Sequence, residues 1–310
     1  MSVVSSFSVT VPATTANLGP GFDCIGTALN LYNGFKFTRL EEGRVFISVT
    51  GSEAGQVQTD ENNLLYRAFM SFYQHLKQTP PPVKIDIKLG VPLARGLGSS
   101  ATAIIGGLFG ANLLAGKPLS QMQLAELAIA LEGHPDNVVP ALLGGCRLTA
   151  TSENGRQICE VPWYREVVPV VAIPNFELST QQARQVLPSQ VSYGSSIFNT
   201  AHLGLLLRGL ETGNAQWLSE ALQDKLHQPY RKNLIRGYDS VHSAALKAGA
   251  YGMVISGAGP TLLALTDILH SEAVEIAMAT AWKQEGIVAT VRSLQVDHKG
   301  VRVVSQGETA

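Results

Sequence analysis

Cysteine is scarce in this chain. Only three of the 310 residues are cysteine, at positions Cys24, Cys146 and Cys159. An odd number of cysteines at wide spacing supplies neither a disulfide framework nor a zinc-binding pattern. This scarcity argues against a small disulfide-stabilised secreted domain and indicates a reducing compartment.

Long apolar runs and a targeting segment are missing as well. No stretch approaches the roughly 20 apolar residues that a membrane-spanning helix needs. Residues 1–10 alternate serine with apolar residues and contain neither the basic region nor the apolar core of a signal peptide. We therefore expect a cytoplasmic protein that has no membrane partner.

Charge is sparse and balanced. The chain has 23 Lys and Arg against 24 Asp and Glu, which gives a formal net charge of −1. The basic residues are scattered and form no run, so the pattern argues against a nucleic-acid partner. Any capacity to bind phosphate must therefore come from a local arrangement of residues.

The length indicates two domains, because a single hydrophobic core stops growing at roughly 250–300 residues. Residues 152–162 are polar and rich in turn formers, as expected of a domain boundary. We predict one domain at residues 1–155 and a second at residues 156–310.

The hydrophobic periodicity predicts both strands and helices. Alternation predicts strands at residues 3–11, where Pro12 ends the run, and at residues 83–89. Helical spacing predicts helices at residues 63–78 and 100–115. Because strands and helices do not alternate regularly along the chain, we predict an α+β fold.

The segment PLARGLGSSAT, residues 92–102, lies between that second strand and that second helix. Gly96 and Gly98 allow the backbone to approach a ligand closely, and Ser99 and Ser100 lie at the helix start, where free amides favour phosphate. The segment contains no lysine, so backbone dipoles, a metal ion and Arg95 would have to supply positive charge. A plain glycine turn before a helix that packs closely on a sheet fits the same residues.

Three segments, taken together, resemble the three motifs of the GHMP kinases, which include galactokinases, homoserine kinases, mevalonate kinases and phosphomevalonate kinases. They are PATTANLGPGFDC at residues 12–24, PLARGLGSSAT at residues 92–102 and GMVISGAGPTLL at residues 252–263. The first has the form that it takes in the homoserine kinases, and the order and spacing cover essentially the whole chain.

This resemblance implies the two-domain GHMP kinase fold, with a ribosomal-protein-S5-domain-2-like N-terminal domain and a ferredoxin-like C-terminal domain. It implies ATP-dependent phosphorylation of the hydroxyl of L-homoserine to O-phospho-L-homoserine, in threonine biosynthesis. ATP is the implied co-substrate, Mg²⁺ the implied cofactor and a homodimer the implied assembly.

The resemblance places ATP against the glycine-rich segment. The implied ATP-binding residues are Asn62 and the whole segment: Pro92, Leu93, Ala94, Arg95, Gly96, Leu97, Gly98, Ser99, Ser100, Ala101 and Thr102. An asparagine before a helix is also an ordinary N-cap, so the adenine contact of Asn62 has a purely structural alternative.

Ser100 and Glu126 are the expected Mg²⁺ ligands. Glu126 lies among apolar residues of a helix expected at residues 122–132, where a buried carboxylate needs a partner. A magnesium ion shared with Ser100 would supply that partner, because Mg²⁺ prefers hard oxygen ligands. The alternative is that Glu126 lies on the exposed face of an amphipathic helix.

The acceptor would be held by polar residues from both halves of the chain. Asn17 and Asp23 flank a Gly-Pro-Gly turn, and a carboxylate suits an ammonium group, although both residue types are also common turn formers. The full set that the resemblance implies for the amino-acid substrate is Asn17, Asp23, His134, Asp136, Asn137, Arg184 and Arg231. Two arginines suit a carboxylate, but without the resemblance each would more often be a surface residue, and a lone histidine near a helix end is more often structural.

Asn17, Asp23, Asn137 and Thr180 are expected to take part in catalysis, with Thr180 near the transferred phosphoryl group. Some GHMP kinases use an aspartate beside a lysine as the base, and no equivalent lysine is apparent beside Asp136. The hydroxyl proton could instead pass to the phosphate while Asn137 orients the acceptor. Both routes stay open at this stage.

Three other functions fit parts of the pattern. A related kinase could act on a mevalonate-type alcohol or a sugar, but Asp23 and the two arginines favour a zwitterion. A regulatory protein of the same fold tends to lose the phosphate segment or the metal ligands, both of which are present here. A nucleic-acid-binding domain conflicts with the near-neutral charge.

Overall fold

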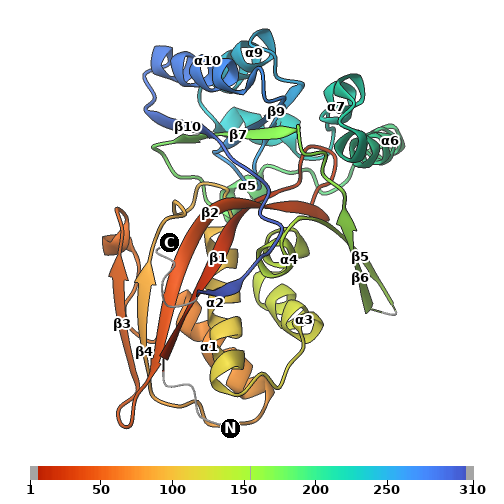
Figure 1. Ribbon diagram of the computed structural model, residues 1–310. Coiled ribbons are helices and arrows are strands. Elements are labelled where there is room, and N and C mark those ends of the chain that lie inside the picture. The colour runs from red at the N-terminus through yellow and green to blue at the C-terminus, as the bar shows by residue number, and fades with distance from the viewer. Residues whose placement is uncertain (1–5, 154, 305–310) are drawn as a thin grey trace.

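The computed structural model describes residues 6–153 and 155–304. Within these residues the chain forms a seven-stranded sheet and a four-stranded sheet, which are drawn one below the other in Figure 1. The mixture of sheets and helices confirms the predicted α+β class.

The larger sheet is mostly antiparallel and has the order β11-β1-β2-β4-β3, with the hairpin of β5 and β6 attached to β2. Its strands are β1 (Ser6–Ala16), β2 (Ile25–Arg39), β3 (Val45–Thr50), β4 (Val83–Lys88), β5 (Cys146–Ser152), β6 (Gly155–Val161) and β11 (Arg302–Val304). Helices α1 (Leu64–His75), α2 (Ser99–Leu114), α3 (Gln121–Glu132) and α4 (Pro135–Leu143) cover one of its faces, and η1 (Ala54–Gln56) follows β3 (Figure 1).

The smaller sheet is antiparallel throughout and has the order β10-β7-β9-β8. Its strands are β7 (Val168–Pro174), β8 (Gly252–Ile255), β9 (Leu262–Thr266) and β10 (Ala289–Ser293). The helices of this half are α5 (Thr180–Gln185), α6 (Tyr193–Thr212), α7 (Ala215–Ala221), α8 (Gln228–Arg231), η2 (Lys232–Leu234), α9 (Tyr238–Lys247) and α10 (Ser271–Gln284).

Alternation along β9 explains how the smaller sheet joins the two halves. Leu262 and Ala264 pack into a core with α9 and α10, whereas Leu263 and Leu265 pack into a second core. That second core also contains Leu18 from the loop after β1. Because successive side chains of a strand point to opposite faces, one strand can contribute to both cores. The smaller sheet is therefore buried on both faces, and one face packs against the N-terminal half.

The start of the chain departs from the sequence prediction at Pro12. We expected Pro12 to end the first strand, and this expectation is wrong: β1 continues through Pro12 to Ala16. The pairing of β1 with β2 shifts register between Pro12 and Ala13, which marks a bulge. A proline is tolerated there because a bulge does not require its missing amide hydrogen. Residues 3–5 of the predicted strand lie outside the described residues.

The boundary predicted between residues 155 and 156 falls at the first residue of β6, which still pairs with β5. The chain passes to the smaller sheet only after Val161, and β11 returns to the larger sheet at the C-terminal end. The division into domains 1–155 and 156–310 stays a prediction. Among the described residues, no helix has the length and apolar character that crossing a membrane requires.

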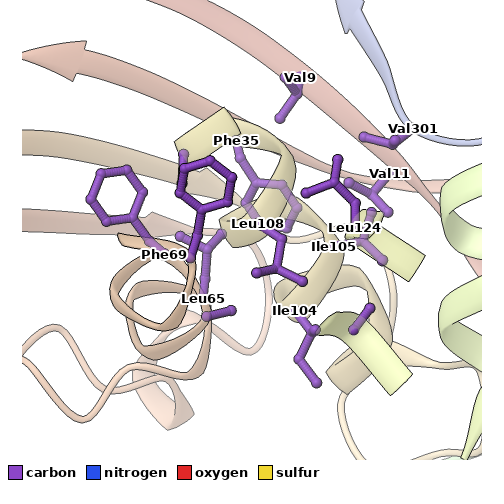
Figure 2. Packing of buried hydrophobic residues seen from close by; sticks show 14 of the residues in the cluster. Val9, Val11, Phe35, Leu65, Phe69, Ile104, Ile105, Leu108, Leu124 and Val301 are labelled. Carbon is purple, nitrogen blue, oxygen red and sulfur yellow. The ribbon is translucent and has the colours of Figure 1, made fainter. Parts of the chain in front are cut away.

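Helix α2 lies close to both the larger sheet and α1 because three of its residues have no side chain. A Cβ on Gly106 or Gly110 would come closer than 3.0 Å to the ring of Phe35 or of Phe37, respectively. A Cβ on Gly107 would come that close to the carbonyl oxygen of Leu65 in α1. Figure 2 shows the buried side chains that surround this helix, among them Phe35 and Leu65. Close packing thus offsets the low helix propensity of glycine and sets the position of α2 against its neighbours.

This packing predicts opposite effects for two glycine-to-alanine substitutions in helices. Gly107→Ala should lower the free energy of unfolding by about 1–3 kcal/mol, because backbone atoms of Leu65 cannot rotate away. Gly204→Ala in α6 should be neutral or stabilising by up to about 1 kcal/mol, because nothing lies within 4 Å of the added methyl group. Urea denaturation followed by circular dichroism measures both, and equal effects would contradict the role given to Gly107.

Candidate active site

A cavity of about 460 Å³ lies where loops of the two halves meet. The loop after β1, the start of α2, the α3–α4 junction, α5, α8 and the loop after β8 all contribute to its wall. Its lining residues form three groups: apolar side chains, the glycine-rich segment before α2, and charged side chains. The cavity therefore combines an apolar wall, a helix N-terminus and ionic groups in one space.

The glycine-rich segment fits between the two halves with no room for side chains. Gly96 and Gly98 have positive φ angles of 75° and 66°. A Cβ on Gly98 would collide with the hydroxyl of Thr14, and one on Gly96 would collide with the carbonyl oxygen of Ser256. The Ser256 hydroxyl also donates a hydrogen bond to the Gly96 carbonyl at 2.6 Å.

Helix α2 begins directly after this segment, with Gly98 as its N-cap. No side chain in the described part of the chain caps this end of α2. The first amides of a helix have no partner within the helix, and the helix dipole adds positive potential there. Gly96, Gly98, Ser99 and Ser100 line the cavity, so this helix end is open to it.

The carboxylate beside Ser100 is Glu132, not Glu126. The Ser100 hydroxyl donates to Glu132 Oε1 at 2.6 Å, and both residues line the cavity. Glu126 is exposed and forms an ion pair with Arg156 of β6. Glu132 comes six positions after Glu126, a rotation of about 600° along the helix, so the two side chains point about 120° apart around α3. The expected placement of Glu126 next to Ser100 is therefore corrected, and the exposed-face alternative holds.

Arg95 is bound within the protein. Its guanidinium donates to Glu53 Oε1 at 2.7 Å and to the carbonyl oxygen of Pro174 at 3.1 Å. The other oxygen of Glu53 accepts from the amide of Leu93 at 2.8 Å. Arg95 thus ties the glycine-rich segment to β7, and its charge is already neutralised by Glu53, which we had not singled out from the sequence.

Residues 132–137 form the junction of α3 and α4. Asp136 and Asn137 lie in the first turn of α4 and are buried. The Thr14 hydroxyl donates to Asn137 Oδ1 at 2.8 Å, so the amide NH₂ of Asn137 points away from Thr14. Sequence reasoning missed Thr14, although it lies within the first motif.

His134 and Asp136 form a close pair, with 2.5 Å between Nδ1 and Oδ1. Burial lowers the pKa of His134, but the hydrogen bond and charge of Asp136, with the charges of Glu132 and Asp23, raise it more. The net pKa of His134 is therefore above its ordinary value. The Asp136 carboxylate is consequently engaged by a histidine that tends to carry a proton.

Asn17 joins two loops. Its side-chain NH₂ donates to the carbonyl oxygen of Gly257 at 2.9 Å, and its Oδ1 accepts from the amide of Asp23 at 2.9 Å. Asn17 and Asp23 both have positive φ angles, 73° and 56°. The amide group of Asn17 is thus used to hold the turn that carries Asp23.

Asp23 and Arg184 form a two-pronged ion pair across the cavity, with N–O distances of 2.9 and 3.0 Å. The hydrogen bond to Asp23 raises the pKa of Arg184. Arg231 is almost fully buried, and burial together with the charge of Arg184 lowers its pKa to about 10. The structure therefore brings together the carboxylate and both arginines that we predicted from distant parts of the chain.

The remaining predicted residues divide by position. Thr180, at the first turn of α5, lines the cavity, as do Leu93 and Ala94.

Asn62 is exposed and bonds to Asp60, whereas its neighbour Asn63 lines the cavity and caps α1. Four residues of the glycine-rich segment are not among those that line the cavity: Pro92, Leu97, Ala101 and Thr102. The predicted adenine contact of Asn62 is not supported by this placement.

Comparison with known proteins identifies the family. The N-terminal domain of the GHMP kinases matches residues 63–145, and their C-terminal domain matches residues 206–287. A homoserine kinase of Nostoc punctiforme is 74% identical over 302 residues, which cover 97% of this chain and 99% of that protein. One of Trichodesmium erythraeum is 62% identical over 97% of this chain and 99% of its own length.

Solved structures agree with the sequence relatives. The crystal structure of homoserine kinase from Cytophaga hutchinsonii superposes with a TM-score of 0.89 at 29% identity, over 98% of this chain and 99% of that one. The complex of L. major mevalonate kinase with R-mevalonate, at 15% identity, shares the fold with a TM-score of 0.73 over 95% and 97%. The predicted GHMP kinase fold is thereby confirmed, and the chain belongs to the GHMP kinases, within the homoserine kinase group.

Proposed function

We infer that the protein transfers the γ-phosphoryl group of ATP to the hydroxyl of L-homoserine and forms O-phospho-L-homoserine. One observation carries this inference: a single cavity contains the open N-terminus of α2 together with Asp23, Arg184 and Arg231. The first feature suits a phosphate chain and the second a zwitterionic amino acid. Relatives named homoserine kinase at up to 74% identity support the same reaction.

The phosphates of ATP would bind at residues 96–100. Backbone amides and the dipole of α2 favour anions there, and the tight fit around Gly96 and Gly98 keeps side chains away from them. Arg95 is already neutralised by Glu53, so it would position this segment rather than contact phosphate as a free cation. Phosphoryl transfer depends mainly on such positioning and on charge stabilisation.

The residues at the start of α2 also fit a magnesium ion. Ser100 and Glu132 present a hydroxyl and a carboxylate oxygen 2.6 Å apart, which are hard ligands of the kind that Mg²⁺ prefers. No cluster of three or more His, Cys, Asp or Glu suitable for a metal exists in residues 6–153 and 155–304, so phosphate and water would complete the coordination. When bound, Mg²⁺ would neutralise the negative charge of the phosphate chain.

Asp23 and Arg184 explain selection of a zwitterion. Each already neutralises the other, so a ligand that separates them must replace both partners. The ammonium of an amino acid can bind Asp23 while its carboxylate binds Arg184 and Arg231. A ligand with only one of the two charges would leave a partly buried side chain without its partner, which is unfavourable.

The hydroxyl proton has no obvious protein acceptor in this cavity. Asp136 is paired with His134 and Asp23 with Arg184, and Glu132 accepts from Ser100 and is assigned to the metal ion. No lysine is among the described residues that line the cavity. We therefore favour direct passage of the proton to the phosphate. Asn137, oriented by Thr14, would donate its NH₂ group to the hydroxyl oxygen, and Thr180 would lie near the transferred group.

Three further parts of this proposal concern the cell. The reaction would belong to threonine biosynthesis, the protein would work in the cytoplasm, and it would assemble as a homodimer. The low cysteine content and the family membership support the first two of these expectations. The homodimer stays a prediction of the family resemblance.

A substrate comparison tests the proposal. We expect ADP release with L-homoserine and Mg²⁺-ATP, and a kcat/KM at least about 10²-fold lower with 4-hydroxybutanoate or 3-aminopropan-1-ol, each of which lacks one charge. Mevalonate and galactose should be inactive because neither carries an ammonium group. A coupled assay measures all five compounds, and activity on mevalonate or galactose without activity on homoserine would overturn the inference.

The two glutamates of α3 provide a matched test of the metal site. Glu132→Gln should lower kcat at least about 10²-fold and raise the Mg²⁺ concentration for half-maximal activity, because a ligand charge beside Ser100 is lost. Glu126→Gln removes only a surface ion pair, so activity and Mg²⁺ dependence should be unchanged. Initial rates over a Mg²⁺ titration measure the difference. A large loss of activity in Glu126→Gln with none in Glu132→Gln would instead identify Glu126 as the metal ligand.

A further inference from the structure

His227 lies completely buried beside the charged side chains of the cavity, although neither the motifs nor the cavity lining includes it. It immediately precedes α8, the helix that carries Arg231. The ring of Phe22 stacks on the His227 ring, with 5.0 Å between centroids and 21° between planes. The guanidinium carbons of Arg231 and Arg184 lie 5.0 and 5.8 Å from the centre of the same Phe22 ring.

The hydrogen bonds of His227 determine its tautomer. Nε2 lies 2.8 Å from the carbonyl oxygen of Gly19, and a carbonyl only accepts, so Nε2 carries the hydrogen. Burial, aided by the charge of Arg231, lowers the pKa of His227 although Asp224, Asp23 and Gly19 raise it. The ring is therefore neutral, and the unprotonated Nδ1 is left as an acceptor.

That acceptor faces Arg231. Nδ1 of His227 lies 3.4 Å from Nη1 of Arg231, a nitrogen that can only donate a hydrogen bond. The same Nη1 donates to the carbonyl oxygen of Gly257 at 3.1 Å, and Nε donates to the carbonyl oxygen of Ala183 at 3.1 Å. Among the described residues, no protein group accepts a hydrogen bond from Nη2 of Arg231, and Arg231 lines the cavity.

The segment before α8 is itself firmly anchored. The Asp224 carboxylate accepts hydrogen bonds from the amides of Leu226, His227 and Gln228, at 2.7 to 2.9 Å, and from the side chain of Asn199 at 2.7 Å. Its oxygen also lies 3.5 Å from Nε2 of His227. The position of the imidazole is thus fixed from the backbone side as well as by Phe22.

We propose that His227 is a positioning residue for amino-acid recognition: its Nδ1 holds the guanidinium of Arg231 while its Nε2–H holds the turn that carries Asp23. This proposal rests on the proposed function, because it assumes that Arg231 and Asp23 bind the carboxylate and ammonium of the acceptor. One imidazole then links the two groups that recognise opposite charges of the substrate. Phe22 supports the arrangement by stacking on His227 and lying under both arginines.

The proposal predicts a selective change in affinity. His227→Leu removes both hydrogen bonds and should raise KM for L-homoserine about 10- to 100-fold, because Arg231 loses an acceptor in a buried site. KM for ATP should be unchanged, because the ring of His227 forms no hydrogen bond with residues 96–100 in the described part of the chain. His242→Leu, in α9 and outside the cavity wall, should leave both KM values unchanged.

Two conservative variants separate the functions of the two ring nitrogens. The Oδ1 of His227→Asn can replace Nδ1 as acceptor for Arg231, so this variant should recover most of the lost affinity. The side chain of His227→Gln can reach the Gly19 carbonyl and replaces Nε2, so its recovery should be smaller. Steady-state kinetics with each substrate varied, together with thermal unfolding of every variant, makes these comparisons.

The outcomes distinguish failure of the role proposed for His227 from failure of the proposed function. Wild-type protein without activity on L-homoserine would overturn the proposed function. Active wild type combined with an unchanged homoserine KM in His227→Leu, or an equal rise in both KM values, would overturn the role of His227 alone. If His227→Leu does not fold, the Asn and Gln variants decide. A KM for L-homoserine equal to that of wild type in both variants would refute the proposal.

Discussion

The fit of residues 96–100 between the two halves is the constraint on which the rest of the site depends. Thr14 of β1 lies against Gly98, and Ser256, which follows β8, lies against Gly96 and bonds to its carbonyl oxygen. Each sheet therefore holds one side of the same short segment. Because no side chain can be added there, the amides at the start of α2 remain accessible to an anion. The glycines of α2 extend this constraint, since close packing on Phe35, Phe37 and Leu65 sets the position of the helix.

Three pairs of charged side chains around the cavity neutralise one another before any ligand is considered. Asp23 pairs with Arg184, Asp136 with His134, and Glu53 with Arg95. An unpaired charge in a partly buried site is unfavourable, so such pairing stabilises the folded protein. It also restricts the chemistry: these three carboxylates are engaged as partners of cations, which makes them poor bases. A ligand must exchange charges with Asp23 and Arg184 to bind. The buried His227, neutral in its surroundings, extends this network to Arg231 without adding another charge.

Much of the fold could be predicted because its signals are local. The strand predicted at residues 83–89 is β4, and the helix predicted at residues 100–115 is α2, each to within about one residue at either end. The family was recognisable because its three motifs are contiguous strings. Errors arose where one residue had two physically acceptable surroundings. Pro12 could end a strand or lie at a bulge, and Glu126 could face the cavity or the solvent, since neighbouring apolar residues do not reveal which face of α3 points inward.

The sequence by itself determined the class of the protein, the glycine-rich start of α2 and the inventory of polar residues near it, because these depend on short-range pattern and backbone freedom. Only the tertiary structure decided which of those residues meet. Ser100 lies beside Glu132 because α3 ends there, Arg95 turns to Glu53, and Arg184 reaches Asp23 across 161 positions of the chain. The reason is physical: the direction of a side chain depends on how helices and sheets pack, and contacts between distant segments leave no periodic signal in the chain.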